Sequence, residues 1–184
     1  DGKLYGDNTD YFGFLYLLKK SGIIISGKKA LVLGSGGASH TALAVLSDLG
    51  ASNIVVISRN GKDNYNNISR HCDTSVIVNS TPVGMYPDCG KSPVSLKDFP
   101  RCEFVADMIY NPAKTALLFE AEQLGIPCIN GLAMLVAQAK KSAELFIGKK
   151  IPDSRIDEIT ARLSFDMQNI VIIGMPGCGK TAAG

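Results

Sequence analysis

Short apolar runs and segments with helical spacing of apolar residues alternate along most of the chain. A short apolar run bounded by turn residues is typical of a buried parallel strand. The predicted strands cover residues 29–33, 53–58, 75–79, 104–107 and 126–129. The predicted helices cover residues 11–20, 38–49, 115–124, 132–147 and 151–164. This alternation predicts a doubly wound α/β domain with a mostly parallel sheet.

The first and the last predicted helices each have an apolar side that we expect to be buried. Gly22 provides a C-terminal stop for the first of them. The apolar positions are Phe14, Leu15, Leu17 and Leu18 in the first helix, and Ile156, Ile159 and Leu163 in the last.

The composition excludes several classes of protein. Of the 184 residues, 46% are hydrophobic and 20% are charged, which is enough to bury a core and unlike a disordered chain. The net charge of +2 does not indicate nucleic acid or an anionic membrane as a partner. No apolar run approaches the roughly 20 residues that span a bilayer, and no segment at the start resembles a secretory signal.

Cysteine and histidine are few and scattered. The five cysteines form no C-x-x-C pair, which argues against a disulfide framework or a zinc site. The two histidines, His40 and His71, stand far apart in the sequence. We therefore expect no metal site and a reducing, cytoplasmic location.

A glycine-rich loop follows the first predicted strand and opens the next helix. Gly34 would make the tight turn, and Gly36 would let the backbone approach a diphosphate at the helix N-terminus. Ser39 occupies the third fingerprint position, where Gly or Ala is usual, and we expect it to loosen the packing of helix against strand. The context favours a Rossmann-like dinucleotide site over a purely structural turn. The predicted cofactor contacts here are Gly34, Ser35, Gly36, Gly37 and Ala38.

The end of the second predicted strand distinguishes between two cofactors. A carboxylate there would accept the ribose 2′-hydroxyl of NAD, but the sequence reads Ser58-Arg59-Asn60. An arginine guanidinium can hold the 2′-phosphate of NADP. A solvated surface arginine is the alternative, and the position of Arg59 after the glycine loop favours the phosphate contact.

Six ordered blocks, between residue 2 and about residue 164, resemble the shikimate dehydrogenase family. The blocks are residues 6–10 (GDNTD), 34–39 (GSGGAS), 58–60 (SRN), 79–85 (NSTPVGM), 107–110 (DMIY) and 130–139 (NGLAMLVAQA). Members of that family have an N-terminal substrate domain and a C-terminal Rossmann domain that holds NADP. Hydride passes between the nicotinamide and the alcohol carbon of shikimate.

The resemblance implies that Asp10 is catalytic and binds the substrate, as the acidic member of a Lys–Asp pair. A carboxylate can orient an alcohol and stabilise a neighbouring cation. Because the chain begins just before this block, we expect the lysine and the N-terminal substrate domain to precede it in a longer protein. The residue chemistry alone leaves open whether Asp10 instead caps the helix that starts at Tyr11.

Further contacts are implied by the resemblance alone. Tyr110 and Gln138 would bind the substrate, because a phenol and an amide suit a polyhydroxylated ring carboxylate. Taken by themselves, they suggest a half-buried aromatic residue at a strand end and a polar residue on a helix flank. The loop after residue 79 would border the cofactor, with a Pro-Gly turn as the alternative, and Gly131 would approach the nicotinamide. The implied cofactor contacts are Thr81, Pro82, Val83, Met108 and Gly131.

Longer members of the family have a further strand and helix where this chain has only residues 61–74. We therefore expect one sheet element to be shortened and the contacts to the adenine to differ.

A second nucleotide motif lies near the end of the sequence. Residues 174–181 fit G-x-x-x-x-G-K-[ST] and follow the apolar run 169–173, as in a P-loop. They resemble the opening of shikimate kinase. We expect residues 1–165 to form the NADP-binding domain and residues 166–184 an incomplete P-loop domain, which should bind ATP poorly. The implied ATP contacts are Gly174, Gly177, Gly179, Lys180 and Thr181.

Together these features predict the cofactor-binding part of an NADP-dependent dehydrogenase that interconverts shikimate and 3-dehydroshikimate. The expected partners are this small-molecule substrate, a preceding substrate domain and a following kinase domain. Two alternatives stay open: a nucleotide-binding regulatory module of an ATP-dependent kinase, and a relative that acts on quinate. The chain by itself is expected to bind NADP(H) and to be nearly inactive.

Overall fold

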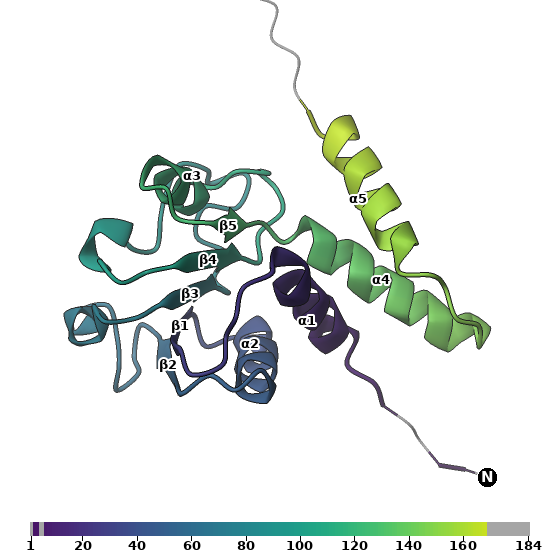
Figure 1. The fold of residues 1–184 in the computed structure, drawn as a ribbon, viewed down its shortest axis with the longest axis horizontal. Coiled ribbons are helices and arrows are strands. Elements are labelled where there is room, and N and C mark those ends of the chain that lie inside the picture. Colours follow the sequence, from purple (N-terminus) through teal and green to yellow (C-terminus); the bar gives the residue numbers. More distant parts are fainter. Residues whose placement is uncertain (1, 4–5, 169–184) are drawn as a thin grey trace, which may run out of the picture.

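A parallel sheet of five strands forms the centre of the computed structural model, which describes residues 2–3 and 6–168 (Figure 1). The strands lie in the order β2-β1-β3-β4-β5, and every neighbouring pair is parallel. Their bounds are β1 Lys29–Leu33, β2 Asn53–Ile57, β3 Val76–Asn79, β4 Phe104–Asp107 and β5 Cys128–Ile129. All five predicted strands are confirmed, although the last is shorter than its apolar run.

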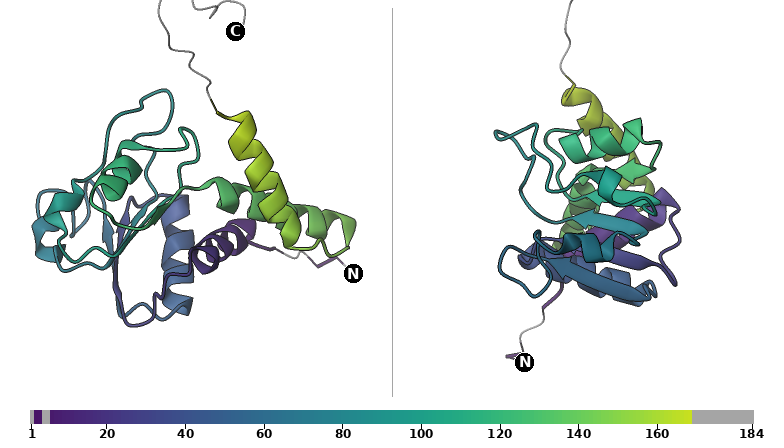
Figure 2. Two further views of the ribbon diagram at one scale, coloured as in Figure 1. Left: turned by 45° about the horizontal axis from the view of Figure 1, so that its top comes forward. Right: turned by 90° about the vertical axis from the view of Figure 1, so that its left-hand side faces the viewer.

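Helices cover both faces of the sheet (Figure 2). On one face lie α1 (Thr9–Ser21), α2 (Gly37–Asp48) and the first turns of α4 (Leu132–Ile147). On the other face lie α3 (Ala116–Gln123) and two short 3-10 helices, η1 (Ile68–His71) and η2 (Leu96–Asp98). The last helix, α5 (Ser154–Asp166), packs against α4 beyond the edge of the sheet. The prediction of a Rossmann-like, doubly wound α/β fold is thus confirmed.

Successive residues of each strand enter different layers of the core, because strand side chains point alternately to the two faces. In β1, Ala30 and Val32 contribute to the layer of α1 and α2, whereas Leu31 and Leu33 contribute to the layer of α3. All four side chains are fully buried. Burial on both faces explains why the strand is a continuous apolar run.

The predicted apolar side is confirmed in the first helix and needs correction in the last. In α1, Phe14, Leu17 and Leu18 are buried and Leu15 is partly buried, and Gly22 ends the helix with a left-handed φ of 73°. In α5, Ile156 is fully buried against α4, but Ile159 is 45% exposed. The contact side of α5 runs through Ile156 and the partly buried Leu163, which leaves Ile159 at its edge.

The segment between β2 and β3 has no further strand, and η1 is its only regular element. Side chains hold it in place instead. Asp63 Oδ1 lies 3.0 Å from His71 Nε2, and Asn67 Nδ2 donates to the carbonyl of Lys62 at 2.9 Å. Asx-type bonds of this kind order a polar segment without a helix. The segment thus contains no additional strand or α-helix, and its shortening relative to longer members of the family stays a prediction.

The predicted P-loop residues, from Gly174 to Thr181, lie outside the described residues. Within residues 2–3 and 6–168, no helix is long and apolar enough to cross a bilayer. The same residues contain no cluster of three or more potential metal ligands. Cys72, Cys89, Cys102 and Cys128 are free thiols.

Candidate functional site

The glycine-rich loop lies at the point where the chain changes direction across the sheet. The loop after β1 leads to α2 on one face, whereas the segment after β3 leads to η2 on the other. In open α/β sheets, ligands bind in the crevice at such a point, beyond the carboxyl ends of the strands. The two segments meet where Ser80 N and Oγ donate to the carbonyl of Leu33, at 2.9 and 2.7 Å.

Gly34 allows this close approach of the two segments. Its φ of 105° is one that side chains rarely tolerate. A Cβ at this position would lie 2.9 Å from Thr81 Cγ2 and 3.0 Å from Ser80 Oγ. The predicted role of Gly34 in a tight turn is therefore confirmed, whereas its contact with a cofactor stays a prediction.

The rest of the loop is open to solvent at the N-terminus of α2. Ser35, Gly36 and Gly37 are exposed, and a Cβ added to either glycine would meet nothing within 4 Å. No side chain caps this helix, and its first turn contains no acidic residue. The unpaired N–H groups and the helix dipole therefore suit an anion. A diphosphate fits the space and the chemistry of this loop.

Ser39 corrects one sequence-based expectation. The residue is buried, with 1% exposure, and its hydroxyl donates to the carbonyl of Gly36 at 2.6 Å. The expectation that Ser39 loosens the packing of helix against strand was wrong. A small hydroxyl fits between α2 and the sheet, and the carbonyl of Gly36 accepts from both the amide and the hydroxyl of Ser39.

Arg59 stands at the same edge of the sheet as the glycine loop, because β1 and β2 are parallel neighbours. It is exposed and directly follows the turn residue Ser58. The turn is tight: Ser58 N donates to the carbonyl of Asp63 at 3.2 Å, and a Cβ on Gly61 would lie 2.4 Å from Ser58 Oγ. Burial raises the pKa of Tyr65, and the charge of Arg59 acts against that rise. Asn60, next in the turn, is exposed as well.

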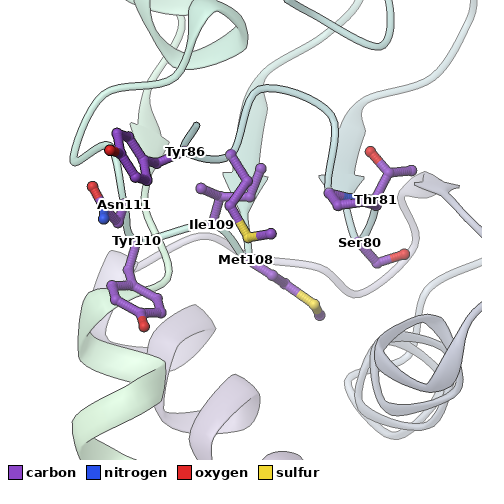
Figure 3. A pocket seen from close by; sticks show the side chains of 9 residues that line it. Ser80, Thr81, Tyr86, Met108, Ile109, Tyr110 and Asn111 are labelled. Atoms are coloured by element: carbon purple, nitrogen blue, oxygen red, sulfur yellow. The ribbon is translucent and has the colours of Figure 1, made fainter. Parts of the chain in front are cut away.

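A pocket of about 400 Å³ opens at the carboxyl ends of β3 and β4 (Figure 3). Thr81 and Ser80 lie at one end of it, and Tyr110 lies at the other, beside the first turns of α4. Tyr110 is 41% exposed. The structure thus brings together the predicted residues Thr81, Pro82, Met108 and Tyr110. The full lining is Ser80, Thr81, Pro82, Met85, Tyr86, Met108, Ile109, Tyr110 and Asn111.

Asp10 does not cap α1, which corrects one of the two interpretations that the sequence left open. The N-cap is Asn8, whose Oδ1 accepts hydrogen bonds from Asp10 N at 3.1 Å and Tyr11 N at 3.2 Å. Asp10 itself is exposed in the first helical turn. Its carboxylate is therefore not used for capping.

Replacing Asn8 with alanine is expected to lower the free energy of unfolding by about 1 kcal/mol, because two helix N–H groups lose their acceptor. Chemical denaturation of both proteins measures the difference. The matched variant Asp10→Asn should stay within about 0.5 kcal/mol of wild type, since its side chain caps nothing. A larger loss for Asp10→Asn than for Asn8→Ala would mean that Asp10 is the structural residue.

Asp10 and Gln138 lie along the seam between α1 and α4. The helices pack closely at Gly13, where a Cβ would lie 2.7 Å from the carbonyl of Met134 and 3.2 Å from Gln138 Cβ. Asp10 is one turn before Gly13 on the same side of α1. Gln138 is partly buried. Neither Asp10 nor Gln138 lines the pocket that contains Tyr110.

Gly131 approaches the main chain rather than an open space. It is buried, and a Cβ there would lie 2.1 Å from the carbonyl oxygen of Met108. Its N–H donates to the carbonyl of Ile109 at 3.0 Å. Glycine is therefore required here for packing α4 against the segment after β4, and a contact with nicotinamide stays a prediction.

Sequence reasoning missed a buried hydrogen-bond network at the base of the pocket. Asn79 Nδ2 donates to Asp107 Oδ1 at 3.0 Å, and both residues are fully buried. Asp107 also accepts from Ile109 N at 3.0 Å and from Thr115 Oγ1 at 2.7 Å. Burial raises the pKa of Asp107 to about 6, and the three hydrogen bonds limit that rise. The sequence did contain a signal for this network, because Asn79 and Asp107 are polar residues at the ends of two otherwise apolar strands.

The raised pKa predicts a pH-dependent difference between wild type and Asp107→Asn. The folded state holds a proton on Asp107 that the unfolded state releases, so this contribution to stability is present at low pH and is lost as the pH rises through about 6. Between pH 5 and pH 7, wild type should therefore lose about 1 kcal/mol relative to the variant. Denaturant titrations of both proteins at several pH values measure it. A constant difference would show that Asp107 has an ordinary pKa.

The chain is similar in sequence to known dehydrogenases, although no family model matches it. It is 36% identical over 176 residues to a shikimate dehydrogenase (NADP(+)) of Clostridium perfringens, covering 89% of this chain and 65% of the relative. The chain thus spans slightly less than two thirds of the length of that relative.

Solved structures agree in fold. A chorismate mutase/shikimate 5-dehydrogenase fusion protein from Clostridium acetobutylicum has a TM-score of 0.83 at 37% identity, over 87% of this chain and 62% of that one. Shikimate 5-dehydrogenase from Thermus thermophilus, in complex with NADP(H) and shikimate, has a TM-score of 0.74 at 32% identity, over 88% and 64%. Over the segment that it shares with these relatives, the chain is similar in sequence and in fold to shikimate dehydrogenases.

Proposed function

We propose that the chain is the cofactor-binding part of an NADP-dependent dehydrogenase that interconverts shikimate and 3-dehydroshikimate. The observation that carries this proposal is the open glycine loop at the N-terminus of α2, with Arg59 at the same edge of the sheet. The proposed substrate and the preference for NADP rest on the relatives, which are shikimate dehydrogenases, one of them in complex with NADP(H) and shikimate.

Three sets of residues would hold the cofactor. The amides of Gly34, Ser35, Gly36, Gly37 and Ala38 would face the diphosphate. The turn Ser58-Arg59-Asn60 would hold the 2′-phosphate, with the guanidinium supplying charge and paired donors. Thr81, Pro82 and Val83 would border the nicotinamide half, together with Met108 and Gly131. NADP(H), when bound, supplies or takes up the hydride.

The substrate would lie between the pocket and the seam of α1 and α4. Tyr110 and Gln138 would direct hydrogen bonds to its ring hydroxyl or carboxylate groups. The Asp10 carboxylate would accept a hydrogen bond from the reacting hydroxyl and orient it, and it would stabilise the cation that forms when a neighbouring neutral base takes the hydroxyl proton. Because Asn8 caps α1, the Asp10 carboxylate is left for these contacts.

Titration of the chain with NADPH and with NADH, followed by nicotinamide fluorescence, tests the proposal. We expect NADPH to bind at least about tenfold more tightly, because only NADPH carries the phosphate that Arg59 would hold. Equal or tighter binding of NADH would contradict it. A relative that acts on quinate is the alternative, and oxidation assays of the longer protein with both ring acids distinguish the two.

The sequence supports one further part of the proposal. The motif Gly174 to Thr181 and the apolar run before it indicate that a P-loop domain similar to shikimate kinase follows the dehydrogenase. ATP binding and shikimate phosphorylation by the longer protein would test this. If the longer protein phosphorylates shikimate but does not oxidise it with NADP, the result would instead favour a regulatory role for the Rossmann-like part.

Free thiols suit a reducing compartment, and we propose the cytoplasm as the location of the protein.

A further inference from the structure

The two walls of the pocket come from neighbouring strands. One wall is the segment 80–86 after β3, and the other is the segment 108–111 after β4. The last residues of these strands, Asn79 and Asp107, are direct partners in the parallel register. The pair therefore lies where the two walls leave the sheet.

At the base of the pocket, side chains connect each wall to this pair. Asn79 Oδ1 accepts from Thr81 N at 3.0 Å and from Thr81 Oγ1 at 2.7 Å, and Thr81 Oγ1 accepts from Val83 N at 3.2 Å. On the other wall, Asp107 Oδ1 accepts from Ile109 N. The bond from Asn79 Nδ2 to Asp107 Oδ1 joins the two sets.

The network also reaches a helix. Thr115 Oγ1 donates to Asp107 Oδ2 and accepts from Leu118 N, so that it caps α3. At the rim of the pocket, Tyr86 N donates to the carbonyl of Asn111 at 3.0 Å. The walls are thus tied at both the base and the rim.

Within the described residues, Asp107 has no ion pair, although a buried carboxylate is costly without one. Apolar residues at these strand ends would avoid that cost but could not hold the amides of Thr81 and Ile109. Both carboxylate oxygens of Asp107 accept hydrogen bonds. A buried polar network whose members are all paired in this way makes its surroundings rigid.

We propose that Asn79 and Asp107 are positioning residues, which hold the Thr81 wall against the Met108–Tyr110 wall in the spacing that binds the cofactor. The cofactor part of this inference rests on the proposed function, whereas the coupling of the walls does not. Neither residue lines the pocket, so both act through the main chain and through Thr81.

An exchange of the two side chains provides the test. Asn79→Asp keeps the acceptor for Thr81 but removes the donor to Asp107 and places a second carboxyl group beside it, so the side-chain bond at the base of the pocket is lost. The double variant Asn79→Asp/Asp107→Asn restores a bond between these two positions with donor and acceptor exchanged, but it removes the acceptor for Ile109 N, because Asp107 Oδ1 accepts from both Asn79 and Ile109. Asp107→Asn alone keeps an acceptor toward Asn79 and is the reference for the double variant.

Two measurements are made on each protein: NADPH affinity by fluorescence, and amide hydrogen exchange of segments 80–86 and 108–111 without nucleotide. For Asn79→Asp we expect about tenfold weaker NADPH binding and faster exchange in both segments. For the double variant we expect both values to recover from those of Asn79→Asp toward those of Asp107→Asn. Thr74→Val, which alters a buried threonine whose hydroxyl has no partner in the described residues, should change neither.

Wild-type affinity and exchange in a folded Asn79→Asp protein would overturn the proposal, as would a double variant no better than Asn79→Asp. If Asn79→Asp does not fold, Asn79→Ala removes the bond to Asp107 without adding charge, together with the acceptor for Thr81, and it must show faster exchange in segment 108–111 as well as in segment 80–86. If wild type does not bind NADPH, the proposed function fails, and the exchange measurement alone decides whether the pair couples the walls.

Discussion

Replacing Gly131 with alanine is expected to lower the free energy of unfolding by about 3 kcal/mol. The added Cβ would lie 2.1 Å from the carbonyl oxygen and 2.6 Å from the carbonyl carbon of Met108. These are main-chain atoms at the end of β4, so they cannot move aside as a flexible side chain would. The φ of Gly131 is −76°, which any residue adopts. The entire effect is therefore steric.

Thermal or denaturant unfolding of Gly131→Ala measures this loss, which corresponds to about 10 °C in melting temperature for a chain of this size. Gly37→Ala is the matched control, because a Cβ there meets nothing within 4 Å. We expect the control to be as stable as wild type or up to about 1 kcal/mol more stable, since alanine is the better helix former. An unchanged stability of Gly131→Ala would mean that α4 is packed less closely than described.

Replacing Arg59 with glutamine is expected to weaken NADPH binding by about tenfold to 100-fold and to leave NADH binding within about twofold. The guanidinium would provide charge-assisted hydrogen bonds that only the 2′-phosphate can accept. Because Arg59 is exposed, part of this attraction is screened by salt, and the effect should shrink at high ionic strength. Fluorescence titrations with both nucleotides at two salt concentrations measure the change.

Arg101→Gln is the matched control for this experiment. Arg101 is also exposed, but it lies before β4, at the edge of the sheet opposite the glycine loop. The control changes the net charge by the same amount and should leave both affinities unchanged. A parallel loss of NADPH and NADH binding in Arg59→Gln would show that Arg59 supports the turn rather than the phosphate.

Much of the fold follows from local patterns in the sequence. The apolar runs predicted all five strands, and the positive φ of Gly22 and Gly34 occurs where the turn residues indicated it. Strand and helix periods are local properties, and a turn needs only the residues that form it. The glycine loop and Arg59 reach one edge of the sheet because parallel neighbouring strands end at the same side.

Other features depend on residues that are distant in the sequence. Asn8 and Asp10 are both good capping residues, and Asn8 is the N-cap because α1 begins at Thr9. Ile159 has the right spacing for burial but lies at the edge of the contact with α4. Gly131 is needed because the main chain at Met108 passes next to it.

From its sequence, the chain could be recognised as alternating strands and helices with a loop suited to a diphosphate, since hydrophobic periodicity and turn chemistry act over a few neighbouring residues. The pairing of Asn79 with Asp107, and with it the base of the pocket, became visible only in three dimensions. These residues are 28 positions apart. The register of two strands and the burial of both side chains bring them together, and neither property is encoded in a single segment.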